Sequence, residues 1–467
     1  TDLSSSVSLN ALVGYEYQKR DETANATLAR DFNVDGDYYN FLQNAQQVFP
    51  IVDAEPIQKL SSYFARTIWS IEDKYVLTAT VRADGSSKFG SDNRFGVFPS
   101  LAGLWNIHQS VDLPLDELKL RVGWGQTGNS EFEAGASQTR WDIAQGDIGI
   151  ENSANPDLKW ETSTTLNLGF DFAAFDYKLI GSIDVFNKLT SDLLFQRQPN
   201  SPAPQSLFWE NLEGSEVVNR GIEVALNYEA INRSDLKLNI GGNISFLDNE
   251  LRDYDGANVV YGQVFGQGTS NTTTHRLEEG QPLNAFYLQR FTGFDEGGLS
   301  TFANDGAPEY VGDPNQSVIY GFNTQLEYKK LSLNLNFNGA LGFDIYNNTL
   351  HTVLPITNLG TRNIAESLVT AGEATTNAIQ ASSRYLESGN YMKLNNATIS
   401  YNLGSVGTFT DVRFYLTGNN LLVFTGYEGF DPEVNTPNNF DGLPSYGIEY
   451  IPYPSARTFL VGVNFSL

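Results

Sequence analysis

Segments in which apolar and polar side chains alternate recur from one end of this sequence to the other. In residues 160–172, for example, Leu166 and Leu168 share one face while Thr165 and Asn167 share the other. A period of two, sustained over about ten residues, is typical of a β-strand whose two sides have different surroundings. The sequence has no run of about 18 apolar residues, which a transmembrane helix would need. These segments predict an all-β fold.

The connections between the segments alternate in length. Short turns are expected at residues 71–74, 173–178, 229–235 and 328–332. Long loops are expected at residues 20–58, 128–158, 189–216, 247–284, 342–390 and 422–455. Short turns on one rim and long loops on the other are typical of an outer-membrane β-barrel, whose apolar face contacts lipid and whose polar face lines a wet lumen. A closed barrel is also the β-structure that satisfies every backbone group inside a bilayer.

The alternation assigns side chains to the two faces of this transmembrane antiparallel β-barrel. The lipid-facing set is expected to include Leu77, Val81, Leu168, Leu335 and Val461. The lumen-facing set is expected to include Thr80, Asn167, Asn336 and Asn464. Four tryptophans occupy apolar-phase positions near strand ends, which favours aromatic girdles at both membrane interfaces. They are Trp69, Trp105, Trp124 and Trp160.

The number of strands between two turns on the same rim must be even. Three strands, at 236–246, 285–294 and 317–328, are expected between two such turns, so a further, weak strand is expected within residues 295–316. The wall then contains about sixteen strands, which alone would permit a complete sixteen-stranded porin.

Composition and charge exclude several other classes of protein. The net charge of −26 argues against a nucleic-acid or anionic-membrane partner. Cysteine is absent, which excludes disulfides, thiolate metal sites and cysteine catalysis. The three histidines, His108, His275 and His351, are far apart and lack the spacing of metal-binding helices or Ser-His sites. We therefore expect no enzyme.

One acidic segment has the spacing of half a calcium-binding loop. Its oxygen ligands would be Asp31, Asn33, Asp35 and Asp37. Gly36 would permit the turn, but the twelfth position is Leu42 rather than Glu, so the bidentate ligand is missing. A solvated acidic loop is the alternative interpretation. Calcium is the one cofactor that the sequence indicates.

Aromatic residues also gather in the expected extracellular loops. They are Trp141, Phe208, Trp209, Tyr254, Tyr261 and Phe265. Aromatic rings with Asn and Asp neighbours suit sugar rings or extended peptides, because they combine apolar contact with polar orientation. Packing of the loops against one another, or against a partner, is the alternative.

Several motifs closely resemble the barrel region of SusC-like TonB-dependent transporters of Bacteroidetes. They lie at residues 60–107, 118–129 (LKLRVGWGQTGN), 155–172, 217–228, 389–404 and 455–467. Members of that family are 22-stranded barrels roughly twice as long as this chain, with an N-terminal plug domain and a TonB-contacting segment. The resemblance implies that residues 1–467 are the C-terminal portion of such a barrel, and that the plug and the first strands are absent from this chain.

By this resemblance the protein would be a multi-pass protein of the bacterial outer membrane that imports oligosaccharides or peptides. A SusD-like surface lipoprotein would capture the cargo, and TonB would supply energy through the plug. Loops 189–216, 247–284 and 342–390 would contact the lipoprotein, with Phe208 and Trp209 as buried anchors. Two alternatives remain: a passive sixteen-stranded porin, and a structural component of a surface or secretion complex.

Three arginines, Arg66, Arg82 and Arg121, fall on the lumen-facing phase of their strands. The resemblance implies that they pair with acidic groups on the plug, because Arg is suited to bidentate contacts with carboxylates. Without a plug they would be ordinary solvated charges.

Overall fold

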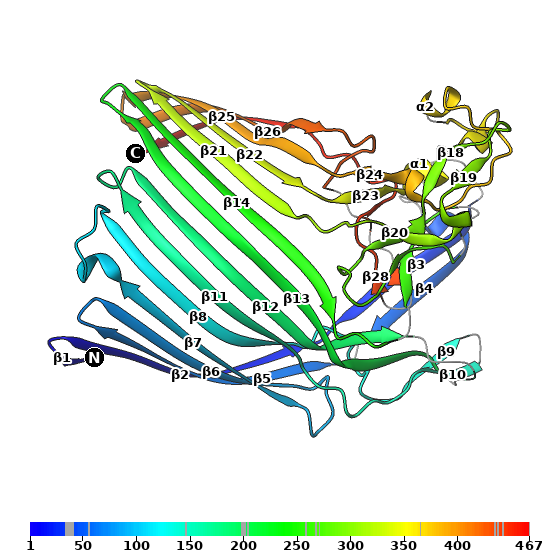
Figure 1. Ribbon diagram of the computed structural model, residues 1–467, viewed down its shortest axis with the longest axis horizontal. Helices are drawn as coiled ribbons and strands as arrows, with labels where there is room; N and C mark the ends of the chain where they lie inside the picture. The colour runs from blue at the N-terminus through cyan, green and yellow to red at the C-terminus, as the bar shows by residue number, and fades with distance from the viewer. Residues whose placement is uncertain are drawn as a thin grey trace.

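The computed structural model describes residues 1–32, 42–54, 57–144, 147–197, 202, 205–256, 259–266, 269, 271–364, 366–433, 436, 439–440 and 443–466. One sheet of seventeen strands dominates the structure (Figure 1). In these ranges no helix combines the length and the apolar character that a membrane crossing needs.

Fourteen strands of this sheet form an antiparallel meander, which we call the wall. They are β2 (Val7–Arg20), β5 (Gln58–Ile71), β6 (Tyr75–Ser86), β7 (Phe95–Asn106), β8 (Glu117–Asn129), β11 (Glu161–Ala174), β12 (Leu179–Arg197), β13 (Gln205–Asn232), β14 (Leu236–Arg252), β21 (Val318–Tyr328), β22 (Leu331–Leu341), β25 (Tyr391–Val406), β26 (Phe409–Thr425) and β30 (Thr458–Ser466). The short turns and both chain ends lie at one end of the strands, on the left of Figure 1.

The remaining three strands of the sheet are short. β1 (Asp2–Ser4) pairs with β2. The hairpin of β9 (Arg140–Ala144) and β10 (Asp147–Asn152) pairs with the N-terminal end of β13. Among the described residues, β2 pairs with β1 and β5, whereas β30 pairs with β26. The two outermost strands of the wall therefore do not pair with each other, and the sheet is open.

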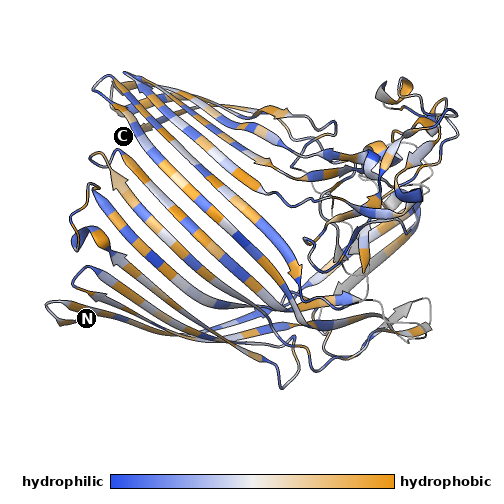
Figure 2. Cartoon of the chain, in the orientation of Figure 1, coloured by the Kyte–Doolittle hydropathy of each residue, from blue (hydrophilic) through white to orange (hydrophobic). Residues whose placement is uncertain are grey.

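The predicted alternation is confirmed on the strands of the wall nearest the viewer, where apolar and polar residues follow each other (Figure 2). Leu168 lies opposite Val122 on one neighbouring strand and Val185 on the other, and all three side chains are 42–45 % exposed. Such a row has no core to cover it, and exposed apolar surface of this extent marks a face that contacts lipid. Leu77, Val81 and Val461 are exposed in the same way, and Leu335 is half-buried. We call the opposite, polar face the lumenal face.

The expected strand within residues 295–316 is not part of the wall, and neither are residues 285–294. β14 pairs directly with β21 over eleven residue pairs, so two strands separate the turns and the parity is even. Residues 286–289 form β17 instead, where Phe286 and Leu288 are 0 % and 3 % exposed. A four-residue strand is too short to cross a bilayer, which needs about 9–11 residues. The number of strands between the two turns is even, as expected, but residues 285–294 and 295–316 do not contribute a strand to the wall.

Smaller elements gather at the other end of the wall, on the right of Figure 1, and we call them the cover. Its sheets are β15 (Val260–Gln263) with β16 (Thr273–Arg276), β17 (Phe286–Gln289) and β20 (Pro308–Gly312); β18 (Phe291–Phe294) with β19 (Ser300–Phe302); β23 (Asp344–Asn347) with β24 (Leu386–Ser388) and β29 (Ile448–Glu449); β27 (Asn439–Phe440) with β28 (Leu443–Pro444); and β3 (Thr23–Phe32) with β4 (Ala45–Ala54). Its helices are α1 (Asn348–Thr352) and α2 (Glu366–Val369), and its 3₁₀ turns are Leu42–Asn44, Asn304–Gly306, Ile356–Asn358 and Ser383–Tyr385. A further 3₁₀ turn, Ile107–Gln109, connects β7 to β8 at the short-turn end of the wall.

The tryptophan prediction is confirmed in part. Trp69 is 38 % exposed near the short-turn end of β5, and Trp105 stacks on Tyr75 at the same rim. Trp160 is 8 % exposed and packs against Phe89 at the cover end, so its assignment to a membrane girdle was wrong. The reason is that the loop after β8 folds over the start of β11 and buries the indole in a small core.

The two faces of β11 allow a direct test of membrane orientation. Replacing Leu168 with Arg should lower the free energy of unfolding by about 2–4 kcal/mol, because it places a charge on the lipid-facing side near mid-strand. Replacing its neighbour Asn167 with Arg should have a much smaller effect, because that side chain faces the wet lumen. Urea titration of the full-length protein folded in lipid vesicles would measure both. Equal losses for the two variants would contradict the assignment of faces.

Candidate functional site

Arg121 is held by two carboxylates of the wall on the lumenal face. Its guanidinium donates to both oxygens of Asp171 at 2.8 Å and to both oxygens of Asp184 at 2.9 Å. Gly169 lies opposite Arg121 in the register, and a Cβ there would lie 2.7 Å from Arg121 Nη2. Glycine thus lets the arginine cross β11 and reach Asp184 on β12. The predicted partner of Arg121 was the plug, whereas the wall itself supplies two charge-assisted pairs.

The other two predicted lumenal arginines differ from each other. Arg82 donates to Asp84 on its own strand at 2.6 Å and to Glu16 on β2 at 3.1 Å. Arg66 is exposed and makes no ion pair within the described part of the chain. Of the three, Arg66 is the one whose charge remains available to a further partner.

The cover has cores of its own, so the long loops are folded structures. Phe286, Tyr346 and Ile448 are each 0 % exposed and belong to one cluster, which joins β17, β23 and β29. Those three strands come from separate loops of the sequence. The cover is therefore a packed layer at the rim of the lumen.

A buried lysine fastens the cover to the wall. Lys393 on β25 is 5 % exposed, and its ammonium donates to Asp431 at 2.6 Å and also to Glu433. The Ser455 hydroxyl donates to the other oxygen of Asp431 at 2.7 Å. Burial alone would raise the pKa of Asp431, but the hydrogen bonds from Lys393, the Glu433 backbone and Ser455 outweigh it, so the pKa lies below its ordinary value.

Two further polar contacts hold parts of the cover together. Arg384 makes a bidentate pair with Glu373, while the rings of Phe291 and Phe294 lie 5.5 Å and 4.9 Å from its guanidinium carbon. This arrangement attaches the β18 hairpin to the segment after α2 by cation–π contact.

Glu449 is the second such contact and is fully buried. It accepts hydrogen bonds from the hydroxyls of Thr349 at 2.7 Å and Tyr427 at 3.1 Å. Burial raises the pKa of this carboxyl. The contact joins α1, β29 and the segment after β26.

The histidines of the cover are structural. Burial lowers the pKa of His275 to about 3 and that of His351 to about 4, so both rings are neutral near pH 7. His275 packs between Tyr261 and Phe286, and His351 hydrogen-bonds the Tyr346 hydroxyl at 3.0 Å. Within the ranges that the structure describes, no three His, Asp or Glu side chains are grouped to hold a metal.

The predicted loop aromatics are not brought together into one platform. Trp141 is 60 % exposed on the β9–β10 hairpin, whereas Tyr261 is 4 % exposed in a cluster that Tyr254 packs against. Phe265 stacks on Tyr450 with ring centroids 4.9 Å apart.

Phe208 and Trp209 are half-buried near the N-terminal end of β13. The Trp209 ring packs 5.7 Å from that of Phe132. Most of the six rings thus serve packing within the cover, and Trp141 presents the most exposed surface. Binding of cargo or of a partner by these residues stays a prediction.

The predicted calcium ligands lie mostly outside the described residues. Asn33, Asp35 and Asp37 lie outside them, and Asp31, the second-last residue of β3, has a positive φ of 58°. Calcium binding at this segment therefore stays a prediction.

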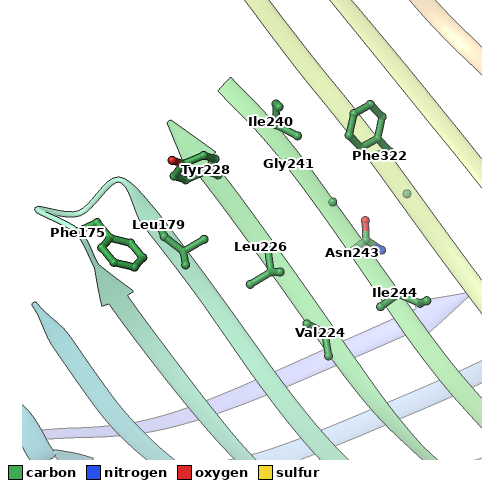
Figure 3. Close-up of a pocket in the computed structure, with 12 residues that line it drawn as sticks. Phe175, Leu179, Val224, Leu226, Tyr228, Ile240, Gly241, Asn243, Ile244 and Phe322 are labelled. Carbon is green, nitrogen blue, oxygen red and sulfur yellow. The ribbon is translucent and has the colours of Figure 1, made fainter. Parts of the chain in front are cut away.

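An apolar groove of about 630 Å³ lies on the outward face of the wall (Figure 3). Leu226, Ile240, Ile244 and Phe322 line it, and the gap between them exists because Gly242 has no side chain. The groove is on the opposite face from the Arg121 pairs. Lipid chains can enter it, whereas a solute in the lumen does not reach it.

A more polar groove of about 660 Å³ lies where the wall meets the cover. Asn219, Asn249 and Asn315 line it together with Asp313. Asn249 donates to Asn219 at 2.7 Å and accepts from the Leu283 backbone at 2.8 Å, so the groove is held open by amide hydrogen bonds. Burial raises the pKa of Asp313. Arg220, Asp248 and Glu250 also line this groove, so it offers a solute both amide and charged hydrogen-bonding groups where the wall meets the cover.

Several of these residues were missed in the sequence. Lys393, Asp431 and Arg384 carry no motif, because their contacts depend on how the loops fold: Lys393 meets Asp431 38 residues along the chain. Asp171 and Asp184 do stand on the lumenal phase, so the alternation alone would have marked them as lumenal acids. Their meeting with Arg121 depends on strand register, which the alternation leaves undetermined.

The sequence matches the family described as TonB dependent receptor-like, beta-barrel, over residues 1–421. It is 31 % identical to TonB-dependent receptor P3 of Formosa agariphila, over 98 % of this chain and 50 % of that protein. It is 29 % identical to TonB-dependent receptor SusC of Bacteroides thetaiotaomicron, over 87 % of this chain and 43 % of SusC. The chain thus spans about half the length of these relatives.

Solved structures show the same fold. The structure titled RagAB peptide transporter superimposes with a TM-score of 0.79 and 21 % identity, over 99 % of this chain and 54 % of that one. A RagAB peptide importer in an open-open state gives a TM-score of 0.80 over 100 % of this chain and 53 % of that one, also at 21 % identity. At this identity the likeness establishes the fold of the wall and its cover.

The Lys393 contact predicts how the cover is attached. Replacing Lys393 with Met keeps the aliphatic stem but leaves Asp431, which is 6 % exposed, without its cation. Removing one partner of a buried pair costs about 3–5 kcal/mol, so residues 426–433 should detach from the wall. Hydrogen exchange of the full-length protein would show faster exchange there. Lys329→Met, at an exposed turn, is the matched control, and equal exchange in both variants would contradict the role of Lys393.

The same contact predicts a dependence on acid. Because the pKa of Asp431 is lowered in the folded protein, its contribution to stability is present above the ordinary carboxyl pKa of about 4 and is lost as the pH falls through the lowered value. The protection factors of residues 426–433, which correct exchange for its intrinsic slowing in acid, should therefore fall as the pH is lowered in the parent and show little further change in the Lys393→Met variant. An identical acid response in both would contradict the assignment.

Proposed function

Because this chain belongs to the TonB dependent receptor-like β-barrel family, we propose that it forms the C-terminal part of the barrel of an outer-membrane importer. Its location in the outer membrane follows from the family and agrees with the exposed apolar rows of the wall. Import itself is an activity of a whole protein, and this chain spans about half the length of its relatives. The proposal carries no catalytic step.

The observation that carries the proposal is a polar lumenal face beneath a packed cover. A plain diffusion pore has no need of a cover with several cores, whereas a receptor that captures large solutes needs a shaped surface at its entrance. The Phe286 cluster and the Arg384 and Lys393 contacts give this cover a fixed form.

The open sheet argues against the porin alternative. A complete sixteen-stranded porin requires its first and last strands to pair, because unpaired backbone groups are costly in lipid. Within the described residues β2 and β30 have no such contact. A barrel of 22 strands needs about eight strands more than the fourteen of this wall. We propose that those strands, and the plug, belong to the same full-length protein.

We also propose a cargo and a partner. The cargo would be an oligosaccharide or a peptide, held at the entrance by a SusD-like surface lipoprotein, and TonB would supply the energy through the plug. Similarity to SusC, and a shared fold with a structure titled as a peptide importer, support this choice. The exposed hairpin of β9 and β10, with Trp141 and Ile148 60 % and 68 % exposed, offers the lipoprotein an apolar contact.

The partner can be tested by purifying the full-length protein from its own outer membrane in mild detergent. We expect a surface lipoprotein to co-purify in stoichiometric amount, because a stable interface buries more than about 1,000 Å². Trp141→Asp should reduce its recovery, while Tyr177→Asp, an exposed aromatic at the short-turn rim, should not. Recovery of a lone barrel would contradict the proposed partner.

Energy dependence provides a separate test. Cells that carry the full-length protein should lose uptake of oligosaccharides or peptides when TonB is removed, because the plug would then stay in place. A porin would continue to pass solutes in proportion to their concentration. Uptake that is unsaturable and unchanged without TonB would overturn the importer and favour the porin.

A further inference from the structure

Asparagines form a continuous row across the lumenal face, following the register between the strands of the wall. In the strand register, Asn227 lies opposite Gly241, which lies opposite Asn323, followed by Asn336, Asn396 and Asn419 on successive strands. The row runs from β13 to β26. We call the five asparagines the amide row.

A second row lies one step closer to the short turns. It consists of Asn239, Gln325, Asn334, Thr398 and Thr417, again opposite one another on successive strands. From β14 to β26 the lumenal face therefore presents two adjacent rows of uncharged groups that both donate and accept hydrogen bonds, while on β13 Glu229 lies opposite Asn239.

Glycine allows the amide row to close over β14. A Cβ at Gly241 would lie 2.6 Å from Asn227 Oδ1 and 2.8 Å from Asn323 Nδ2. The two carboxamides therefore lean over the bare backbone of Gly241 from either side. Any side chain at this position would push them apart.

Most of these carboxamides are not committed to the wall. Asn396 donates to Asn419 at 2.8 Å, and Asn419 donates to Thr458 at 3.1 Å. Asn323 and Asn336 are exposed to the lumen and make no side-chain hydrogen bond to another residue that the structure describes. Their donors and acceptors are free for water or for a solute.

The rest of the wall carries more fixed ions. From β2 to β12 the lumenal face carries the Arg82 pair with Glu16 and Asp84 and the Arg121 pairs with Asp171 and Asp184, and this charged region reaches Glu223 on β13, which lies opposite Asp184. A solute that passes closely over fixed ions must displace their water, which is costly unless it replaces those contacts. Exchange of hydrogen bonds between neutral amides and a polar solute carries no such penalty.

We propose that the amide row lines the passage along which an uncharged, hydroxyl- or amide-bearing cargo moves through the lumen. This inference rests on the proposed import function and adds the side of the barrel on which movement occurs. The charged side, from β2 to β12, would remain covered during transport. Sugar hydroxyls and peptide groups share the hydrogen-bonding chemistry that the row offers.

Single cysteines would test the side of passage, because this chain contains none of its own. The variants are Asn336→Cys in the amide row and Asn167→Cys on the charged side, both made in the full-length protein in intact cells. A membrane-impermeant, uncharged maleimide is the probe, and the parent protein gives the background. We expect labelling at residue 336 to rise several-fold when TonB is active, with no rise at residue 167.

Equal rises at the two positions, or a rise at residue 167 alone, would overturn the inference. If the unmodified parent protein showed no TonB-dependent uptake, the import function itself would be overturned, so the two failures are distinguishable. Heat-modified gel mobility would verify that each variant is folded.

The uncharged class of cargo has its own readout. For each variant, the labelling rate with the neutral maleimide is divided by the rate with a sulfonated maleimide of the same size. This ratio is then divided by the same ratio for Trp141→Cys, a variant on the exposed hairpin, which corrects for the intrinsic reactivity of the two reagents. We expect the neutral reagent to be preferred at residue 336 by several-fold. A normalised ratio near one would overturn the selectivity for uncharged groups.

Discussion

Every peptide group that enters lipid must find a hydrogen-bond partner within the protein, and this requirement organises the whole chain. The fourteen-strand wall meets it along its length, since each interior strand pairs on both sides. Its outermost strands, β2 and β30, do not meet each other in the described residues. In a membrane those edges would need further strands, which agrees with the proposal that this chain is part of a larger barrel. The exposed apolar rows, such as Val122, Leu168 and Val185, have lipid as their only natural cover.

The period of two that directs leucines toward lipid also directs polar side chains toward the lumen. The chemistry of these lumenal side chains differs from one part of the wall to another. From β2 to β12 several charges are paired within the wall, as at Arg121, where glycine at position 169 allows one guanidinium to reach carboxylates on two strands. From β13 to β26 the groups are mostly neutral amides, and Gly241 serves their packing. Glycines without unusual backbone angles thus shape both halves of the lumenal surface.

Sequence reasoning succeeded where the physics is local. Alternation placed Leu168 outward and Asn167 inward, because neighbouring residues on a strand face opposite sides. It failed at residues 285–294, whose alternation reflects packing on both sides within the cover rather than a membrane crossing. It also failed at Trp160, which a loop buries. The pairing of Arg121, the burial of Lys393 and the alignment of Asn323 with Asn336 all depend on register or on loop folds, and a period of two leaves both open.

The cover is attached at points that resist movement. Lifting it from β25 would break the hydrogen-bonded pair of Lys393 and Asp431, and loosening it internally would break the Arg384–Glu373 pair and expose Phe286. Each of these changes is costly, since buried charges tolerate the loss of a partner poorly. Opening the lumen would therefore cost less free energy if it were controlled by separate parts that only contact the cover and the wall. A lid over the entrance and a plug against the charged side would supply that control, leaving the amide row as the fixed surface past which the cargo moves.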